Sequence, residues 1–197
     1  MENDKIKTQN KQKNKQIKKG DYGYLKKNKL IQLIVSLVLM SIVCIIFYTG
    51  YIKYGNTKNI FTVFAILSVL PMAKFVVGYL MLAKHNSISI DDYNKIHQNI
   101  NHKLVYDLII SSSERTYPVK VAIVQDNSVC LYIPDEKIKK NEAEKYVRSF
   151  LEKECKISAV KVADKLDEFI KIASSLEKNE SGRYDKRISE LLLIYSL

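Results

Sequence analysis

One triplet resembles part of a phosphodiester-cleaving site, because it combines two acids with a lysine. It consists of Asp135, Glu136 and Lys137 and follows the end of a predicted strand. Such a site needs one carboxylate at the mouth of a strand and another, with a lysine, in the next strand. The acids hold a metal ion, and the lysine stabilises charge on the phosphate. The predicted strands at 118–125 and 128–133 contain no acidic residue, and the triplet lies beyond the second of them. We therefore predict no catalysis from these residues.

The other reactive side chains are few and widely spaced. The 197 residues contain no Gly-rich phosphate loop, no GxSxG turn and no HExxH pair. The cysteines form no CxxC pair, and two of the histidines are five residues apart, so a helix would not place them on one face. These residues are Cys44, Cys130, Cys155, His85, His97 and His102. The sequence predicts no catalytic residue, no metal site and no cofactor, and it favours a non-enzymatic role over an enzymatic one.

Two long apolar runs, at 30–51 and 60–83, determine where the rest of the chain lies relative to a membrane. A helix rises about 1.5 Å per residue, so each run can cross a hydrocarbon core of about 30 Å. The first run is longer than the roughly 7–15 apolar residues of a signal peptide, and no small-residue cleavage pattern follows it. Glycine and asparagine residues in the short connection favour a turn. We predict a transmembrane α-helical hairpin.

The lysines orient this hairpin. Ten lie in the first 29 residues and Lys84 follows the second run, whereas the connection holds only Lys53 and Lys58. By the positive-inside rule both termini are cytoplasmic, in a multi-pass protein of the cell (inner or plasma) membrane. Lysines beside the membrane attract anionic headgroups by about 1 kcal/mol each. The predicted lipid-surface contacts are Lys18, Lys19, Lys26, Lys27 and Lys29; binding of nucleic acid by the leader is the less favoured alternative.

Pro71 and Lys74 interrupt the second apolar run. A lysine at the middle of a membrane helix costs about 2.5–3.5 kcal/mol on insertion scales. Either Lys74 joins a narrow polar seam between the helices or subunits, or its amine reaches the inner headgroups through local thinning of the bilayer. Neither run contains an acid, which argues against a self-contained ion or proton pathway. The residues of the predicted seam, besides Pro71 and Lys74, are Ser36, Ser41, Ser68 and Gly78.

The remaining 84–197 segment has the size and pattern of one globular domain. Its predicted order is α, β, β, β, α, β, α, α, with the first three strands forming an antiparallel meander around a turn at Asp126 and Asn127. The predicted elements are a helix from Ser89 to about His102, strands at 104–111, 118–125 and 128–133, a helix opened by Asn141 with Glu144 and closed at Lys156, a strand at 157–162, a helix opened by Asp164 with Asp167, and a last helix through Ile188–Tyr195.

The succession of a helix, three strands, a helix and a further strand is similar to the core of restriction-endonuclease-like folds, although the active-site residues of those enzymes are missing here. The sequence thus predicts a basic and flexible leader at 1–29, a membrane hairpin at 30–83 and a cytoplasmic α/β domain at 84–197, which is restriction-endonuclease-like at most in its order of elements. Fold analogy of this kind says little about function.

Three segments of the chain resemble uncharacterised two-span membrane proteins of low-GC Gram-positive bacteria. They are Gly20–Leu25, Gly50–Lys53 and the stretch from Asn59 to Lys74. The resemblance covers roughly Gly20–Ala83 and, more loosely, the segment that follows, and it implies no activity because the function of these proteins is unknown.

We expect a non-enzymatic, membrane-anchored module whose cytoplasmic domain binds another protein or senses the membrane. The expected partners are a bilayer with anionic headgroups and a protein or a second copy of the chain, with nucleic acid disfavoured. The alternatives are a membrane-tethered nuclease-like or nucleic-acid-binding domain and a small multimeric transport component.

Overall fold

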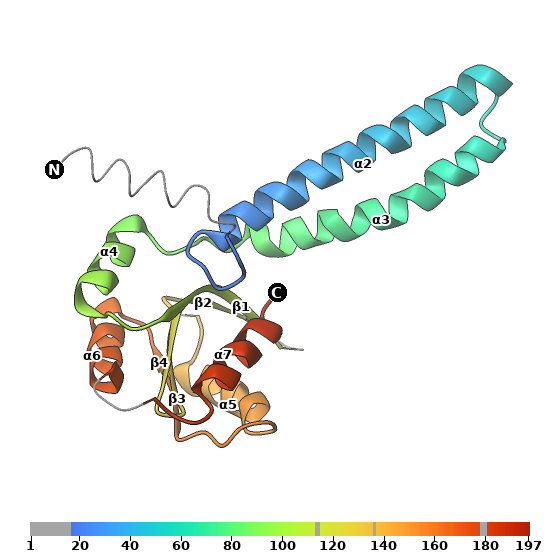
Figure 1. The fold of residues 1–197 in the computed structure, drawn as a ribbon. Coiled ribbons are helices and arrows are strands. Elements are labelled where there is room, and N and C mark those ends of the chain that lie inside the picture. The colour runs from blue at the N-terminus through green and yellow to red at the C-terminus, as the bar shows by residue number, and fades with distance from the viewer. Residues whose placement is uncertain (1–16, 113–114, 136, 178–180) are drawn as a thin grey trace, which may run out of the picture. The chain divides into compact units, whose positions relative to one another are not determined.

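The computed structural model describes residues 17–112, 115–135, 137–177 and 181–197. The chain divides into two compact units. One is the segment Leu25–Asn86, which forms a pair of helices. The other combines the residues up to Tyr24 with Ser87–Leu197 and forms an α/β domain, so that the α/β domain is built from both sides of the hairpin in the sequence (Figure 1).

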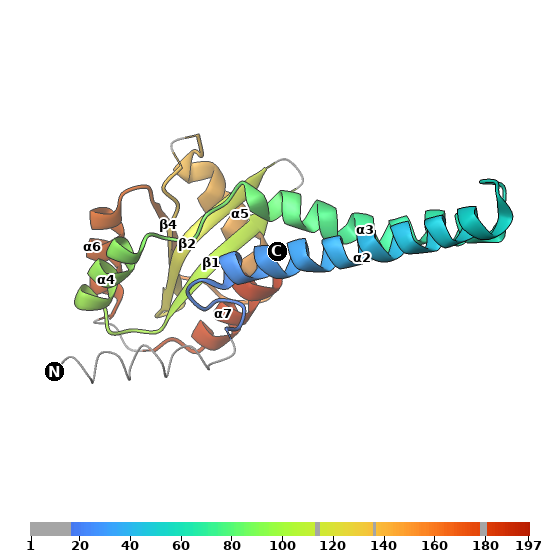
Figure 2. The ribbon, with the colours of Figure 1, turned by 90° about the horizontal axis from the view of Figure 1, so that it is seen from above.

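The helical unit consists of α2 (Tyr24–Tyr54) and α3 (Ile60–Ala83). The two helices run side by side in opposite directions (Figures 1 and 2), as the sequence predicts. The bounds of α3 match the predicted 60–83, whereas α2 begins six residues before the predicted start and continues three residues past the predicted end. Asn59 closes the turn: its Oδ1 accepts from the amide of Thr62 at 3.0 Å, and its Nδ2 donates to the carbonyl of Asn56 at 2.7 Å.

Both helices are long and apolar enough to cross a membrane. In each, only 6% of the most apolar stretch is buried inside the structure. A core helix of a water-soluble protein would be mostly buried, because burial of apolar surface is what holds such a helix in place. These helices are therefore suited to a surrounding apolar solvent, which supports association of the chain with a membrane.

The α/β domain confirms the predicted order of elements. They are α4 (Ile90–Asn99), β1 (Leu104–Ser111), β2 (Thr116–Gln125), β3 (Ser128–Tyr132), α5 (Lys140–Leu151), β4 (Ala159–Ala163), α6 (Leu166–Glu177) and α7 (Asp185–Ile194). The sheet order is β1-β2-β3-β4. The first three strands are the predicted antiparallel meander, with the predicted turn at Asp126 and Asn127, and β4 adds to β3 in parallel.

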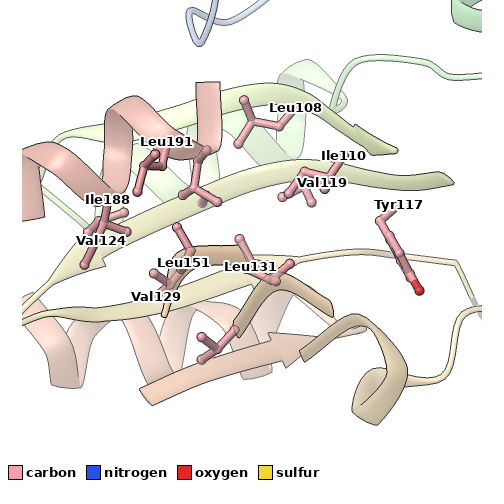
Figure 3. Packing of buried hydrophobic residues seen from close by; sticks show 14 of the residues in the cluster. Leu108, Ile110, Tyr117, Val119, Val124, Val129, Leu131, Leu151, Ile188 and Leu191 are labelled. Carbon is pink, nitrogen blue, oxygen red and sulfur yellow. The ribbon is translucent and has the colours of Figure 1, made fainter. Parts of the chain in front are cut away.

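The sheet is covered by helices on both faces, with α4 and α6 on one side and α5 and α7 on the other (Figure 1). On the second face, Ile188 and Leu191 of α7 belong to the same buried cluster as Leu108, Val124 and Leu131 of the strands (Figure 3). A sheet buried on both faces needs apolar side chains at nearly every strand position. This explains why the strand sequences are almost continuously hydrophobic.

The side chains of β2 depart from strict alternation between the two faces at one point. Val119 belongs to the core cluster on the α5–α7 face, whereas Val121 and Ile123 belong to the cluster on the α4–α6 face. The change coincides with Asp107 on the neighbouring strand, whose φ of 55° is left-handed. This conformation interrupts the pairing between Tyr106↔Val121 and Leu108↔Val119. A left-handed residue twists the strand locally, so the side chains beyond it point to the opposite face of the sheet from the one that alternation predicts. A strict period of two in the sequence does not indicate this change.

The predicted start and end of α5 are also wrong. Its N-cap is Lys139, without a side-chain hydrogen bond, and the helix ends at Leu151, before the predicted Lys156. Glu144 forms no capping box with Asn141. Its Oε1 accepts instead from the amide of Val162 on β4, at 2.9 Å. The predicted capping residue therefore satisfies a backbone donor of the edge strand.

Candidate functional site

The described residues contain no group of three or more His, Cys, Asp or Glu side chains that could hold a metal ion. Asp107 is the one carboxylate within the four strands. Asp135 accepts from the amide of Lys137 at 3.0 Å and so belongs to a local turn, while Glu136 lies outside the described residues. Burial raises the pKa of the Cys130 thiol to about 12. A protonated thiol is a poor nucleophile, so this cysteine is part of the core.

The two segments that connect to the hairpin meet on adjacent residues of β1. Before α2, the carbonyl of Gly20 accepts from the amide of Tyr106 at 2.8 Å. After α3, the hydroxyl of Ser87 donates to Oδ2 of Asp107 at 2.8 Å. Asp107 is buried and is the strand's left-handed residue. The chain thus returns to one point on an edge strand on both sides of the hairpin.

Four rings surround this point, and we call them the junction cluster: Tyr22, Tyr93, His97 and Tyr106. Tyr22 precedes α2, Tyr93 and His97 lie on α4, and Tyr106 lies on β1. The Tyr22 and Tyr93 ring centroids are 4.3 Å apart, and the Tyr93 and His97 rings are stacked at 4.2 Å. The Tyr106 hydroxyl and His97 Nδ1 are 3.1 Å apart and share a hydrogen bond. The cluster joins the segment before α2 to the first helix after α3.

Burial raises the pKa of all three tyrosines of the junction cluster. For Tyr22 the negative charge of Asp107 raises the pKa further, and for Tyr106 a charge on Tyr93 would do the same. The hydroxyls therefore stay protonated at physiological pH. The ring of Tyr22 is partly buried and packs against Tyr93 and Tyr106 in the α/β domain.

The segment before α2 also contacts the C-terminus. Lys19 Nζ donates to the carbonyl of Ser196 at 2.6 Å, and the amide of Leu197 donates to the carbonyl of Ile109 at 2.8 Å. Burial lowers the pKa of Lys19. Lys19 thus uses its amine within the fold, while the lipid contact predicted for it stays a prediction. These residues and Gly20 cover the outer edge of β1, so both ends of the α/β domain's chain protect that edge from further pairing.

The other predicted lipid contacts are placed differently. Lys29 Nζ donates to the carbonyls of Ala83, at 3.2 Å, and of His85, so it ties together the ends of α2 and α3. Lys18, Lys26 and Lys27 are exposed and stay as predicted headgroup contacts.

The residues of the predicted intramembrane seam lie in two different environments. Ser36 is buried, with its hydroxyl bonded to the carbonyl of Leu33, and Gly78 faces Gln32 so closely that a Cβ on Gly78 would lie 2.6 Å from Gln32 Oε1. These residues lie between the two helices. Pro71 and Lys74 are exposed on the outside of the pair and do not belong to that seam. The seam and the outer face are thus separate surfaces.

Sequence reasoning missed the junction cluster, Ser87, Asp107 and Gln32. Gln32 could have been singled out from the sequence, because it is a polar amide within an apolar run. The tyrosines could have been singled out too, since they gather near the run ends, but a membrane-interface role accounts for the same pattern. Asp107 had no signal in the sequence, because a left-handed aspartate cannot be read from spacing.

The chain matches no family model, no curated protein and no solved structure at a significant level.

Proposed function

We propose that this chain is an integral membrane protein whose α/β domain, on the cytoplasmic side, binds a protein or senses the state of the bilayer without catalysing a reaction. The observation that carries the proposal is the meeting of both connecting segments on Tyr106 and Asp107. A domain that only needed an anchor could hang from a flexible linker, which would transmit little force or orientation.

A change in the tilt or spacing of the two helices would act on the ends of both connecting segments. Each end is held to β1 by a specific hydrogen bond, one to the amide of Tyr106 and one to the carboxylate of Asp107. The left-handed backbone at Asp107 is a conformation of higher energy for a residue with a side chain. A strained residue at the point where both segments attach is a suitable element for two alternative arrangements.

The proposal includes the orientation given by the lysines. Both termini lie in the cytoplasm, and Lys18, Lys26 and Lys27 lie near anionic headgroups of the cell membrane. The resemblance to two-span membrane proteins of low-GC Gram-positive bacteria agrees with this topology.

Labelling of single cysteines in whole cells tests the topology. The exposed Cys44 is first replaced by serine; Cys130 and Cys155 are buried and stay in place. In that background, Asn56→Cys is expected to react with a membrane-impermeant reagent, and Ser181→Cys only after lysis. Reaction of Ser181→Cys in intact cells would overturn the orientation.

Thermal unfolding in bilayers tests the sensing role. The full-length protein is placed in vesicles of short-chain and of long-chain phosphatidylcholine. Attachment of both segments predicts that the Tm of the α/β domain differs between the two bilayers, and that Ser87→Ala makes the difference smaller. Equal Tm values in both bilayers would contradict sensing and leave protein binding as the role.

A second candidate is a membrane-tethered nuclease-like or nucleic-acid-binding domain, which the order α4-β1-β2-β3-α5-β4 favours. It predicts metal-dependent cleavage or salt-sensitive binding of DNA by the full-length protein in detergent. The absence of both activities would eliminate it.

A further inference from the structure

Lys74 lies on the outer surface of the helical pair, within the apolar run of α3. It is exposed, and within the described ranges the structure gives it no hydrogen bond and no ion pair. The residues one and two turns away on the same face of α3 are exposed as well. They are Leu67, Leu70, Pro71, Val77 and Met81, and together with Lys74 we call them the Lys74 stripe.

The depth of Lys74 keeps its amine from the headgroups. Lys74 lies two to three residues from the middle of α3 (Ile60–Ala83), or about 4 Å along the axis at about 1.5 Å per residue. If α3 is centred in a core of about 30 Å, the Cα of Lys74 is about 11 Å from the nearer boundary. An extended lysine side chain is much shorter than that distance. Reaching the headgroups would require thinning of the bilayer, which also costs free energy.

A second copy of the chain does not supply a negative charge that could pair with Lys74. Neither α2 nor α3 contains an aspartate or a glutamate. Two copies that met symmetrically through the Lys74 stripe would bring two cations together at the same depth, and like charges in a medium of low dielectric constant repel strongly. A neutralising group must therefore come from a different molecule.

Pro71 removes a backbone hydrogen bond on the same face. A proline has no N–H, so the carbonyl of Leu67 has no donor four residues further along its own helix. Leu67, Pro71 and Lys74 lie on one face of α3, at spacings of four and three residues. The stripe thus presents an ammonium donor and a backbone acceptor to a solvent that can satisfy neither.

We propose that the Lys74 stripe is the docking surface for a transmembrane helix of another protein that carries an aspartate or a glutamate near mid-membrane. The carboxylate pairs with the Lys74 ammonium, and the flanking leucines and valine pack against the partner helix. Charged groups inside membranes are normally paired in this way. The inference rests on the proposed membrane insertion and names the partner's chemistry for the protein-binding role.

A synthetic helix provides the probe. The full-length protein, labelled with a fluorophore at Asn56→Cys, is placed in phosphatidylcholine vesicles with a polyleucine transmembrane peptide that has one aspartate at its centre. The control peptides carry leucine or lysine at that position. Energy transfer should report about tenfold tighter association of the aspartate peptide than of the leucine peptide, because interhelical polar contacts contribute roughly 1–2 kcal/mol. Lys74→Leu should abolish the difference, and Lys74→Glu should transfer the preference to the lysine peptide.

The matched control is Lys84→Leu, which removes the exposed lysine at the end of α3 and should keep the preference for the aspartate peptide. Equal association of the aspartate and leucine peptides with the inserted protein would overturn the inference alone. So would loss of the preference on adding phosphatidylglycerol, which would assign Lys74 to anionic headgroups, or Lys74-dependent self-association of the protein. Extraction of the protein from membranes by alkaline carbonate would contradict both the inference and the proposed function.

Discussion

The α/β domain and the helical pair differ in where their charged and apolar side chains lie. In the α/β domain the buried carboxylate of Asp185 accepts from the amides of Asp126, Asn127 and Gly182 at 2.6–3.1 Å. In the helical pair, Gln32 Oε1 is buried without a partner among the described residues, and Lys74 is exposed within an apolar helix. Most of the large exposed hydrophobic residues also lie in α2 and α3. The α/β domain thus buries its apolar side chains internally, whereas the helical pair exposes a charge and much apolar surface.

This difference shows where each kind of change should act. A substitution in the α/β domain should change its free energy of unfolding, because its interactions are internal. A substitution on the outside of the helical pair should instead change insertion or association and leave that free energy unchanged.

The largest expected effect is at Asp185, whose carboxylate holds the β2–β3 turn to the start of α7. Asp185→Ala leaves buried amides of the turn without an acceptor and should lower the free energy of unfolding by roughly 3–5 kcal/mol. Urea unfolding followed by circular dichroism measures this loss. The matched control is the exposed Asp167 in the first turn of α6, for which Asp→Ala should cost less than about 1 kcal/mol. Equal losses at the two positions would mean that the turn does not depend on Asp185.

The next effect is at Lys74 and concerns insertion. Lys74→Leu should favour membrane insertion of α3 by about 3 kcal/mol, because it removes a charge from the apolar run. Reporter glycosylation sites on either side of α3 measure the inserted fraction in an in vitro translation system with microsomes. The urea unfolding of the α/β domain should not change. Lys84→Leu should have a much smaller effect on insertion, and a loss of domain stability in Lys74→Leu would contradict the separation of the two units.

Tyr22 and Tyr24 both precede Leu25–Asn86, but only Tyr22 has its ring in the junction cluster. Tyr22→Ala removes a ring of the junction cluster and should lower the free energy of unfolding of the α/β domain by about 2 kcal/mol. Tyr24→Ala changes the first residue of α2 and should have little effect on that quantity. Chemical unfolding of the two variants in the same detergent gives the comparison. The opposite order would contradict the packing of Tyr22 in the α/β domain.

The smallest effect is at Tyr106 and depends on pH. Its pKa is raised in the folded protein, so above the ordinary tyrosine pKa of about 10 the unfolded chain loses this proton first, and stability falls as the pH rises through that range. Tyr106→Phe should lower stability near pH 7 by about 1 kcal/mol, through loss of the hydrogen bond to His97. It should also make the alkaline decline shallower. Unfolding measured from pH 7 to pH 11 tests both effects, and an unchanged alkaline slope would argue against the buried hydroxyl.

Much of the fold follows from pattern alone. The apolar runs gave both long helices, and the order of elements from 84 to 197 was predicted correctly, because period and turn residues are local properties. The parallel addition of β4 to β3 depends on contacts between distant segments, which spacing does not encode. The shift at Asp107 was missed for a related reason, since a left-handed residue changes the pattern without changing composition.

The candidate site was harder to predict. Lys74 and Pro71 stood out because a charge and a helix breaker are rare in apolar runs. The structure places them on exposed positions and buries Ser36, because small differences in helical angle decide which face a residue occupies. The junction cluster joins residues 22 and 106, whose contact depends on the tertiary fold. Most of the predicted flexible leader, at 1–16, lies outside the described residues.

The central claim is that both segments flanking the hairpin are attached to β1, so that the α/β domain responds to the membrane. Hydrogen exchange of the full-length protein in short-chain and long-chain bilayers tests it most directly at the amide of Tyr106, which donates to Gly20. The account predicts that the protection of this amide differs between the two bilayers, while the amide of Leu131 in the central strand β3 is unchanged. Identical protection of Tyr106 in both bilayers would contradict it.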